Sequence, residues 1–310
     1  MSQTAKAFGN SAIEYLVERL IDYAGLFPPA SLNMRAAVTN YAVYSRSEYS
    51  WVLGRFIVPA ARLIEFEEAV GALSNTGTDS VQWDLSVLLG ADPSADVDHI
   101  HKFNVRRAAL NSGIKAVIDS VEAKASSPDE VRLLDALIPH ELTAYFELPL
   151  SGRLRETIAA VEDCRGRRLK IRTGGETADK FPPPEAVVEF LRLCVSADMP
   201  FKATAGLHHP VRSVHRFTYQ PDSPAGMMHG FLNVFLAAAF LRRGMDAALA
   251  VDVLKEELPS AFRFDAEGVS WREHRLDTCD LFLARRDFSI SFGSCSFTEP
   301  IDDLRALLLI

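Results

Sequence analysis

The sequence predicts a (β/α)8 barrel, the TIM-barrel fold, formed by one domain over residues 1–310. Short apolar runs alternate with longer segments of helical periodicity, and eight such runs are typical of parallel strands joined by helices. A chain of 310 residues is long enough for a barrel of this kind with one insertion. The connection over 207–287 is far longer than the others, which places the insertion between the seventh and eighth strands.

Each apolar run is an expected strand. The runs lie at residues 20–26, 55–60, 81–90, 114–119, 142–148, 168–173, 200–206 and 288–294. The helices expected between them cover residues 62–73, 98–111, 128–137, 153–164 and 184–196. Ser127 with Pro128, and the segment from Pro182 to Pro184, favour two of the helix starts, because capping residues and prolines are common in first turns. An open doubly wound sheet with a small appended domain is the alternative fold.

The insertion has the pattern of two helices and a hairpin. One helix is expected over 226–243, a second near 246–257, and a hairpin around 262–273. The apolar segment Phe231–Leu241 is too short to cross a bilayer, so a buried helix is expected there. An apolar helix of this kind could form part of a lid or of a contact between subunits, which leaves a homo-oligomer open.

Charge and cysteine content narrow the function classes. The net charge of −8 and the pI of about 5.5 argue against nucleic acid as a partner, because binding a polyanion requires a basic surface. The cysteines have no short paired spacing, which indicates reduced thiols, and the amino-terminal segment lacks the pattern of a secretory signal. The four cysteines are Cys164, Cys194, Cys279 and Cys295. A cytoplasmic protein that binds a small molecule, and neither nucleic acid nor a membrane, is therefore expected.

Charged residues are expected inside the barrel. Side chains alternate between the helix-facing side and the interior of a barrel strand. If Leu169 and Ile171 face the helices, Lys170 and Arg172 point inward.

The two neighbouring strands follow the same alternation, with Lys202 and Thr204 inward from one and Tyr145 and Glu147 inward from the other. Such buried charges cost several kcal/mol each unless they are paired, and a purely structural barrel fills its interior with Val, Ile and Leu. A lysine beside a second cation loses its proton more easily and can then attack a carbonyl, while a nearby carboxylate moves protons. A structural network with Glu147 and Asp119 is the alternative role for these lysines.

Three motifs resemble those of one family. The run Lys-Ile-Arg-Thr-Gly at 170–174 resembles the Lys-x-x-Thr-Gly run of the deoxyribose-phosphate aldolase family. The run Phe-Lys-Ala-Thr-Ala-Gly at 201–206 is similar to the family's Phe-Lys-x-x-Gly-Gly, and Phe-Gly-Ser-Cys-Ser at 292–296 resembles its last-strand Gly-x-Ser-Ser turn. Leu20-Ile21-Asp22 is a weaker match to the first strand. The similarity covers mainly residues 142–206 and 288–297.

The resemblance implies a class I aldolase-like lyase that makes or breaks a carbon–carbon bond and needs no metal or organic cofactor. Lys170 would form a Schiff base with a small carbonyl substrate, phosphorylated or acidic, and Lys202 would be its cationic neighbour. The phosphate would be held by backbone amides of Gly174, Gly175, Gly206 and Gly293 and by the Ser294 hydroxyl. Arg172, Thr173 and His208 complete the expected substrate-binding residues.

The sequence also departs from the family. Ala205 replaces the first of two glycines, and Arg172 stands where the family has a small residue and could bind a carboxylate or phosphate bidentately. The family's proton-relay aspartate has no clear counterpart, so Asp119 and Asp84 are the candidates by inward alternation, and Asp119 joins Glu147 as an expected catalytic carboxylate. A substrate other than deoxyribose phosphate is therefore expected.

Two other functions are alternatives. His208 and His209 follow the seventh strand, at the face where barrel active sites lie, and could belong to a metal-dependent hydrolase or isomerase. The further ligands of such a site would come from His215, His229, Asp22 and Glu147. Adjacent histidines at a strand end usually diverge, however. The other alternative is a non-catalytic barrel that binds a phosphorylated or acidic ligand. Cys295 lies at the same face, and its expected role is that of a small buried filler.

Overall fold

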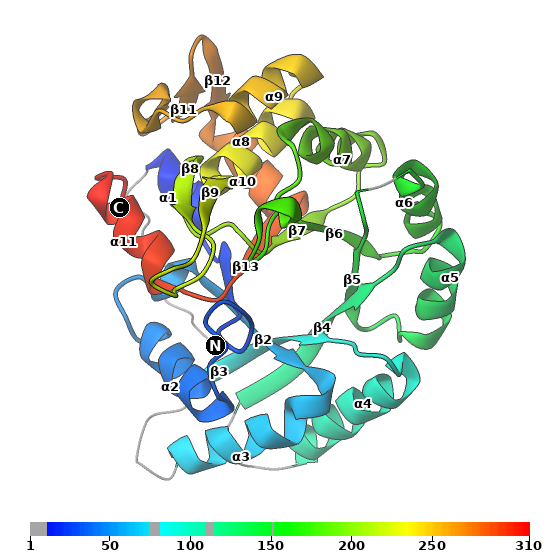
Figure 1. Ribbon diagram of the computed structural model, residues 1–310. Coiled ribbons are helices and arrows are strands. Elements are labelled where there is room, and N and C mark those ends of the chain that lie inside the picture. Colours follow the sequence, from blue (N-terminus) through cyan, green and yellow to red (C-terminus); the bar gives the residue numbers. More distant parts are fainter. Residues whose placement is uncertain (1–10, 75–80, 110–114, 151) are drawn as a thin grey trace.

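The computed structural model describes residues 11–74, 81–109, 115–150 and 152–310 (Figure 1). Eight parallel strands form a closed barrel in the order β1-β13-β7-β6-β5-β4-β3-β2, and the helices surround it. The predicted (β/α)8 barrel is confirmed. Residues 110 and 111, at the end of one expected helix, and residue 114, at the start of one expected strand, lie outside the described residues.

Each expected apolar run overlaps one barrel strand. The strands are β1 (Ile21–Tyr23), β2 (Leu53–Pro59), β3 (Gln82–Leu88), β4 (Lys115–Lys124), β5 (Thr143–Glu147), β6 (Arg168–Arg172), β7 (Phe201–Thr204) and β13 (Ser289–Ser294). Strand β4 continues five residues beyond the expected end at 119, and this extension brings Glu122 into the barrel.

The five expected helices are all present. The helices around the barrel are α1 (Ala12–Val17), α2 (Met34–Tyr44), α3 (Leu63–Ser74), α4 (Pro93–Ala109), α5 (Pro128–Leu137), α6 (Leu154–Glu162), α7 (Pro184–Ser196) and α11 (Thr298–Ala306). Helix α5 begins as expected, because the Ser127 hydroxyl accepts the Glu130 N–H at 3.3 Å and Pro128 occupies the first turn. Four short 3-10 helices are η1 (Ser50–Val52), η2 (Ala60–Arg62), η3 (Ala178–Lys180) and η4 (Pro259–Ala261).

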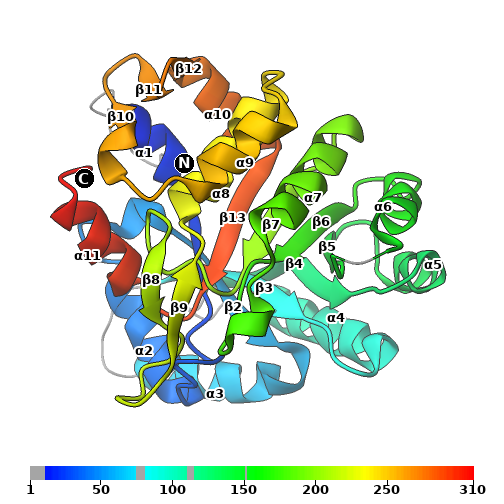
Figure 2. The same ribbon diagram turned by 45° about the horizontal axis from the view of Figure 1, so that its top comes forward.

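The insertion lies between β7 and β13, as predicted. It contains β8 (Ser213–Arg216), β9 (Ala225–Met228), α8 (Phe231–Arg242), α9 (Ala247–Lys255), β10 (Phe262–Phe264), β11 (Gly268–Trp271), β12 (His274–Asp277) and α10 (Thr278–Asp287). The expected helix 226–243 was placed too early, because residues 225–228 pair with β8 instead. The expected hairpin gains a third strand, β12. Figure 2 shows the β8–β9 hairpin beside α11.

Helix α8 is buried on every side. All residues from Phe231 to Leu241 are buried, and α7, α9, α10 and β13 pack around them. The polar residue of this buried segment, Asn233, donates to the carbonyls of Val253 at 2.8 Å and Glu256 at 2.9 Å and accepts the Arg212 N–H at 2.9 Å. The apolar helix is thus covered within the chain. None of the helices in the described ranges is both long and apolar enough to cross a bilayer.

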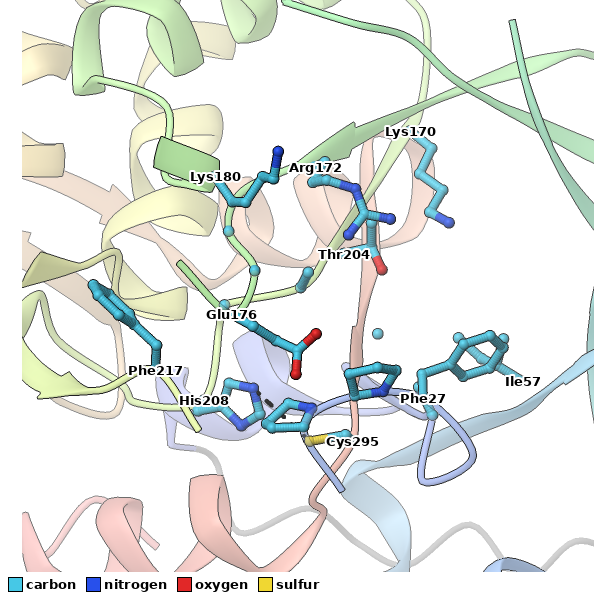
Figure 3. Close-up of a pocket in the computed structure, with 18 of the residues that line it drawn as sticks. Phe27, Ile57, Lys170, Arg172, Glu176, Lys180, Thr204, His208, Phe217 and Cys295 are labelled. Carbon is cyan, nitrogen blue, oxygen red and sulfur yellow. Dashed lines mark hydrogen bonds between the residues drawn. The ribbon is translucent and has the colours of Figure 1, made fainter. Parts of the chain in front are cut away.

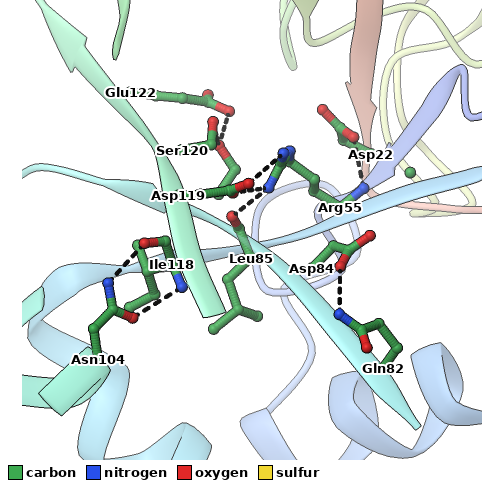
Figure 4. A network of polar contacts seen from close by, with 12 residues as sticks. Asp22, Arg55, Gln82, Asp84, Leu85, Asn104, Ile118, Asp119, Ser120 and Glu122 are labelled. Atoms are coloured by element: carbon green, nitrogen blue, oxygen red, sulfur yellow. Dashed lines mark hydrogen bonds and ion pairs between the residues drawn. The ribbon is translucent and has the colours of Figure 1, made fainter. Parts of the chain in front are cut away.

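A β-bulge in β4 decides which residues face the barrel interior (Figure 4). Leu85 of β3 is paired with Ile118, but the next residue of β3, Ser86, is paired with Ser120. Asp119 therefore has no partner in β3 and is the extra residue of the bulge. The Ser86 hydroxyl then lies 3.1 Å from the Ser120 hydroxyl and donates to Glu122 Oε1 at 2.7 Å. The bulge therefore turns Glu122 inward.

The barrel closes where β1 pairs with β13, and a buried arginine of α10 holds this seam. Arg285 donates to the carbonyls of Leu16 at 2.7 Å, Glu18 at 3.1 Å and Ile290 at 2.6 Å, and also to that of Ser289. One side chain thus joins the end of α1 to the start of the last strand.

Candidate active site

Two lysines and a glutamate occupy the centre of the barrel. Glu122 Oε2 lies 2.7 Å from Lys170 Nζ, and Glu122 Oε1 lies 2.8 Å from Lys202 Nζ. The three residues come from β4, β6 and β7, and none is more than 3% exposed. The inward orientation expected for both lysines is confirmed.

Three further charges complete the network. Lys170 Nζ is 2.9 Å from Glu147 Oε2, whose other oxygen is 2.9 Å from Arg172 Nε. Lys202 Nζ is 2.6 Å from Asp22 Oδ2. Three cations therefore face three carboxylates. This balance offsets the desolvation of the buried charges.

The pKa shifts follow from this pairing. Burial alone would raise the pKa of Glu122, but the two ammonium groups outweigh it and hold the pKa well below the ordinary value. Burial alone would lower the pKa of Lys202, but Asp22 and Glu122 outweigh it and raise the pKa. The Tyr145 ring, 4.9 Å from Lys202 Nζ, adds a cation–π contact. Lys202 is therefore a fixed cation.

A cavity of about 640 Å³ opens at the carboxyl ends of the strands (Figure 3). Within the described part of the chain, its wall includes Lys170 and Glu122 but not Lys202. The two lysines thus differ in access: Lys170 lines the cavity, whereas Lys202 lies behind its wall. The charged side chains of the wall are Lys124, Lys170, Arg172, Lys180, Glu122 and Glu176, together with His208.

The four glycines expected around a phosphate, Gly174, Gly175, Gly206 and Gly293, all line this cavity. Phe181 packs closely on two of them. A Cβ at Gly174 would lie 2.6 Å from the Phe181 ring and 2.8 Å from Gly206 Cα. Gly206 also has a φ of +74°. Close packing therefore requires glycine at both positions whether or not a phosphate binds.

Two other expected phosphate-binding residues are buried in loop contacts. The Thr173 hydroxyl donates to the Ala205 carbonyl at 2.7 Å, and the Ser294 hydroxyl accepts the Ser296 N–H at 3.3 Å. Ala205 itself has a φ of +63°, the left-handed conformation that favours glycine. Thr173 and Ser294 thus fix the loops that frame the cavity.

The carboxylates expected by alternation lie away from the lysines. Asp119 is paired with Arg55 (Figure 4), and Asp84 lies 2.6 Å from Arg19 Nη2. Glu122, and not Asp119, lies beside the lysines, because Asp119 is the bulged residue. The adjacent polar residues at 119 and 120, where the alternation of polar and apolar residues changes phase, are the sequence signal that could have revealed the bulge.

The histidines diverge at the cavity rim. His208 Nδ1 is 2.9 Å from Glu299 Oε2, whereas His209 Nδ1 is 2.7 Å from Asp303 Oδ2. The two rings are 6.4 Å apart, and His209 stacks on His215 with centroids 3.3 Å apart. Among the described residues, no group of three or more His, Cys, Asp or Glu side chains has an arrangement that could hold a metal ion.

The remaining metal-ligand candidate among the histidines lies elsewhere. His229 Nε2 donates to the Pro182 carbonyl at 2.8 Å, which ties the start of α8 to the segment before α7. Asp22 and Glu147, named for the same metal site, are both engaged by lysines.

The cavity thus presents an amine, a carboxylate 2.7 Å from it and a fixed cation behind them. That set suits carbonyl chemistry. No protein-family model and no curated protein sequence matches the chain. A functional assignment therefore depends on the residues of the cavity.

Proposed function

We propose that the protein is a class I aldolase-like lyase whose Lys170 forms a Schiff base with a small, anionic carbonyl compound. The observation that supports this most directly is the position of Lys170. Its ammonium group lies between Glu122 and Glu147 and reaches the cavity, while the second lysine is sealed beneath.

The first step is proton transfer from Lys170. Glu147, at 2.9 Å, accepts the proton and passes it to the carbonyl oxygen, while the neutral amine attacks the carbonyl carbon of the substrate. A carbon–nitrogen bond forms, the carbonyl oxygen takes up two protons, and water leaves. The resulting iminium is again a cation at position 170, so the balance of three cations and three carboxylates is restored.

The iminium then acts as an electron sink. In the cleavage direction, a carboxylate takes the proton of the substrate's β-hydroxyl, the carbon–carbon bond breaks, and its electrons form an enamine with the Lys170 nitrogen. Glu147, 2.9 Å from Lys170 Nζ, is placed for this proton. Protonation of the enamine and hydrolysis of the iminium release the second product and restore Lys170.

The charge of the cavity favours an anionic substrate. The wall contains four lysine and arginine side chains and two carboxylates, although the protein as a whole has a net charge of −8. A concave cationic site attracts small anions. Arg172, whose side chain is 45% exposed, is placed to bind a carboxylate or phosphate. This chemistry requires no metal or organic cofactor.

We assign the protein to the cytoplasm, with a small molecule as its partner. All four cysteines are free thiols, as expected in a reducing compartment. The acidic composition disfavours nucleic acid.

Borohydride trapping tests the proposal. The protein is reduced in the presence of small aldehydes and ketones that carry a carboxylate or a phosphate, and peptide mass spectrometry locates the adduct. We expect a reduced adduct on Lys170 that is lost in Lys170→Ala. Lys255→Ala, which removes a partly exposed lysine outside the cavity wall, is the control and should leave the adduct unchanged.

Lys202→Leu should weaken trapping at Lys170 without moving the adduct. The absence of a Lys170 adduct across the panel would contradict the Schiff base. If calorimetry then showed that the same compounds bind without turnover, the barrel would be a binding protein with a structural charge network.

A further inference from the structure

A thiol, an imidazole and a carboxylate meet at another part of the cavity wall. Cys295 Sγ lies 4.0 Å from His208 Nε2, and His208 Nδ1 lies 2.9 Å from Glu299 Oε2. Cys295 follows the end of β13, His208 belongs to the loop after β7, and Glu299 lies in the first turn of α11. Three separate elements thus place one imidazole between a thiol and a carboxylate.

A tyrosine from the β8–β9 hairpin completes this cluster. Tyr219 Oη donates to Glu299 Oε2 at 3.2 Å and lies 3.6 Å from Cys295 Sγ. Cys295 is 6% exposed and His208 is 9% exposed, yet both line the cavity. The cluster is therefore shielded from bulk solvent but open to a ligand in the cavity.

The imidazole of this cluster is a cation at neutral pH. Burial would lower the pKa of His208, but its contacts with Cys295 and Glu299 outweigh burial and raise the pKa to about 10. The other titratable groups around His208 are His209, whose Nε2 is 4.0 Å from Glu299 Oε1, and Asp303, which lies 2.7 Å from His209 Nδ1. An imidazolium in contact with a thiol can protonate a leaving group, and the neutral imidazole can take a proton from the thiol or from water.

We propose that Cys295, His208 and Glu299 form a second reactive centre that hydrolyses a small anionic ester or thioester through an acyl intermediate on Cys295. A nucleophile, a base in contact with it and a group that orients the base are what this chemistry requires. The cationic wall of the cavity selects an acyl group that carries a carboxylate. The proposal does not rest on Schiff-base formation, because Lys170 and Cys295 lie at different sides of the cavity (Figure 3).

The reaction has two balanced steps. In the first, the Cys295 thiolate adds to the acyl carbon, a carbon–sulfur bond forms, and the bond to the leaving group breaks as that group takes the Nε2 proton of His208. In the second, neutral His208 takes a proton from water, and the resulting hydroxide attacks the thioester. The carbon–sulfur bond breaks, which releases the acid and restores the thiolate–imidazolium pair. Glu299 positions His208 throughout.

Alkylation tests the reactivity of Cys295, with an internal reference. The intact protein is treated with iodoacetamide at pH 7, and peptide mass spectrometry gives a rate for each cysteine. Cys279 is exposed on α10 and is the reference thiol. We expect Cys295 to react faster than Cys279 despite its burial, because an imidazole in contact with Cys295 can take its proton. His208→Gln should remove this advantage, and the control His209→Gln should not.

Acyl transfer is tested with the mono-4-nitrophenyl ester of succinic acid. We expect release of nitrophenol, a succinyl adduct on Cys295 in rapidly quenched samples, and loss of both in Cys295→Ser. Glu299→Gln should lower both the acylation rate and the alkylation rate of Cys295. Alkylation of Cys295 that is no faster than that of Cys279 in the wild type, or nitrophenol release that survives in Cys295→Ser, would overturn the proposal.

The two centres can fail separately. Cys295→Ser should retain the borohydride adduct on Lys170, and Lys170→Ala should retain the succinyl adduct on Cys295. A Cys295 adduct without any Lys170 adduct would therefore contradict the lyase proposal and support the acyl-transfer proposal.

Discussion

His208 illustrates how a single residue couples the cavity to the stability of the protein. The imidazole is nearly buried, and its two nitrogens lie against a carboxylate and a thiol. The folded state therefore binds the proton of His208 more tightly than the unfolded chain does. The pKa is about 10 in the fold and 6.5 in a free imidazole.

This difference predicts a specific pH dependence. A raised pKa stabilises the fold fully below pH 6.5, and the contribution is lost as the pH rises to about 10. We expect the free energy of unfolding of wild type to exceed that of His208→Gln at pH 6 and the difference to shrink steadily towards pH 10. Urea denaturation of both proteins at a series of pH values measures this difference in the free energy of unfolding. The same substitution at the exposed His99 is the control, and a difference for His208→Gln that grows with pH would contradict the prediction.

Single residues also show where prediction from sequence succeeded and failed. Alternation placed Lys170 and Lys202 correctly, because β6 and β7 pair without interruption over 169–172 and 201–204. The same alternation rule failed in β4, because the bulge at Asp119 changes which residues face the interior and brings Glu122 inward. The local sequence indicates which residues of a strand are polar and which are apolar, but it does not determine how that strand pairs with its neighbours.

At the scale of elements, the connections were harder to predict than the strands. All eight apolar runs became strands, because buried parallel strands need continuous apolar residues. Helices α1, α2, α10 and α11 were missed, as was the β8–β9 hairpin. Two members of the cluster around Cys295 and His208 come from such regions: Glu299, which contacts His208, lies on α11, and Tyr219 lies in the hairpin connection. The neighbourhood of the thiol therefore depends on tertiary packing that no short motif encodes.

Helix α8 provides a test at this scale. Asn233 is fully buried and satisfies the Arg212 N–H and the carbonyls of Val253 and Glu256. We expect Asn233→Leu to leave these three groups unpaired and to lower the free energy of unfolding by about 3 kcal/mol or more. Urea denaturation measures the loss.

The control for this substitution is Leu236→Met on the same helix, which preserves apolar volume and should cost less than about 1.5 kcal/mol. Equal stability of the two variants would show that the Asn233 hydrogen bonds contribute little.

At the scale of the whole molecule, the barrel depends on its closure between the first and last strands. Arg285 donates to backbone carbonyls of α1, of the residue that follows it and of β13. We expect Arg285→Met to lower the free energy of unfolding by on the order of 3 kcal/mol, because buried carbonyls lose their donors. Arg286→Met, which removes an exposed neighbour paired with Asp287, is the matched control and should change the free energy of unfolding by less than about 1 kcal/mol. Similar losses in both variants would contradict a special role for the seam.

The bulge in β4 has a consequence for how this barrel can evolve. The alternation restarts at the bulge, and Glu122 lies opposite Leu88. Loss of one codon after the bulge, at Val121, would bring Ala123, in place of Glu122, to this position beside the two lysines, without any substitution at either residue. Gain of one codon elsewhere in such a strand could install a carboxylate just as abruptly. Among descendants of a common ancestor, the presence of the carboxylate should therefore follow strand length more closely than overall similarity. Alignments that ignore gaps inside strands would overlook the event that adds or removes this carboxylate.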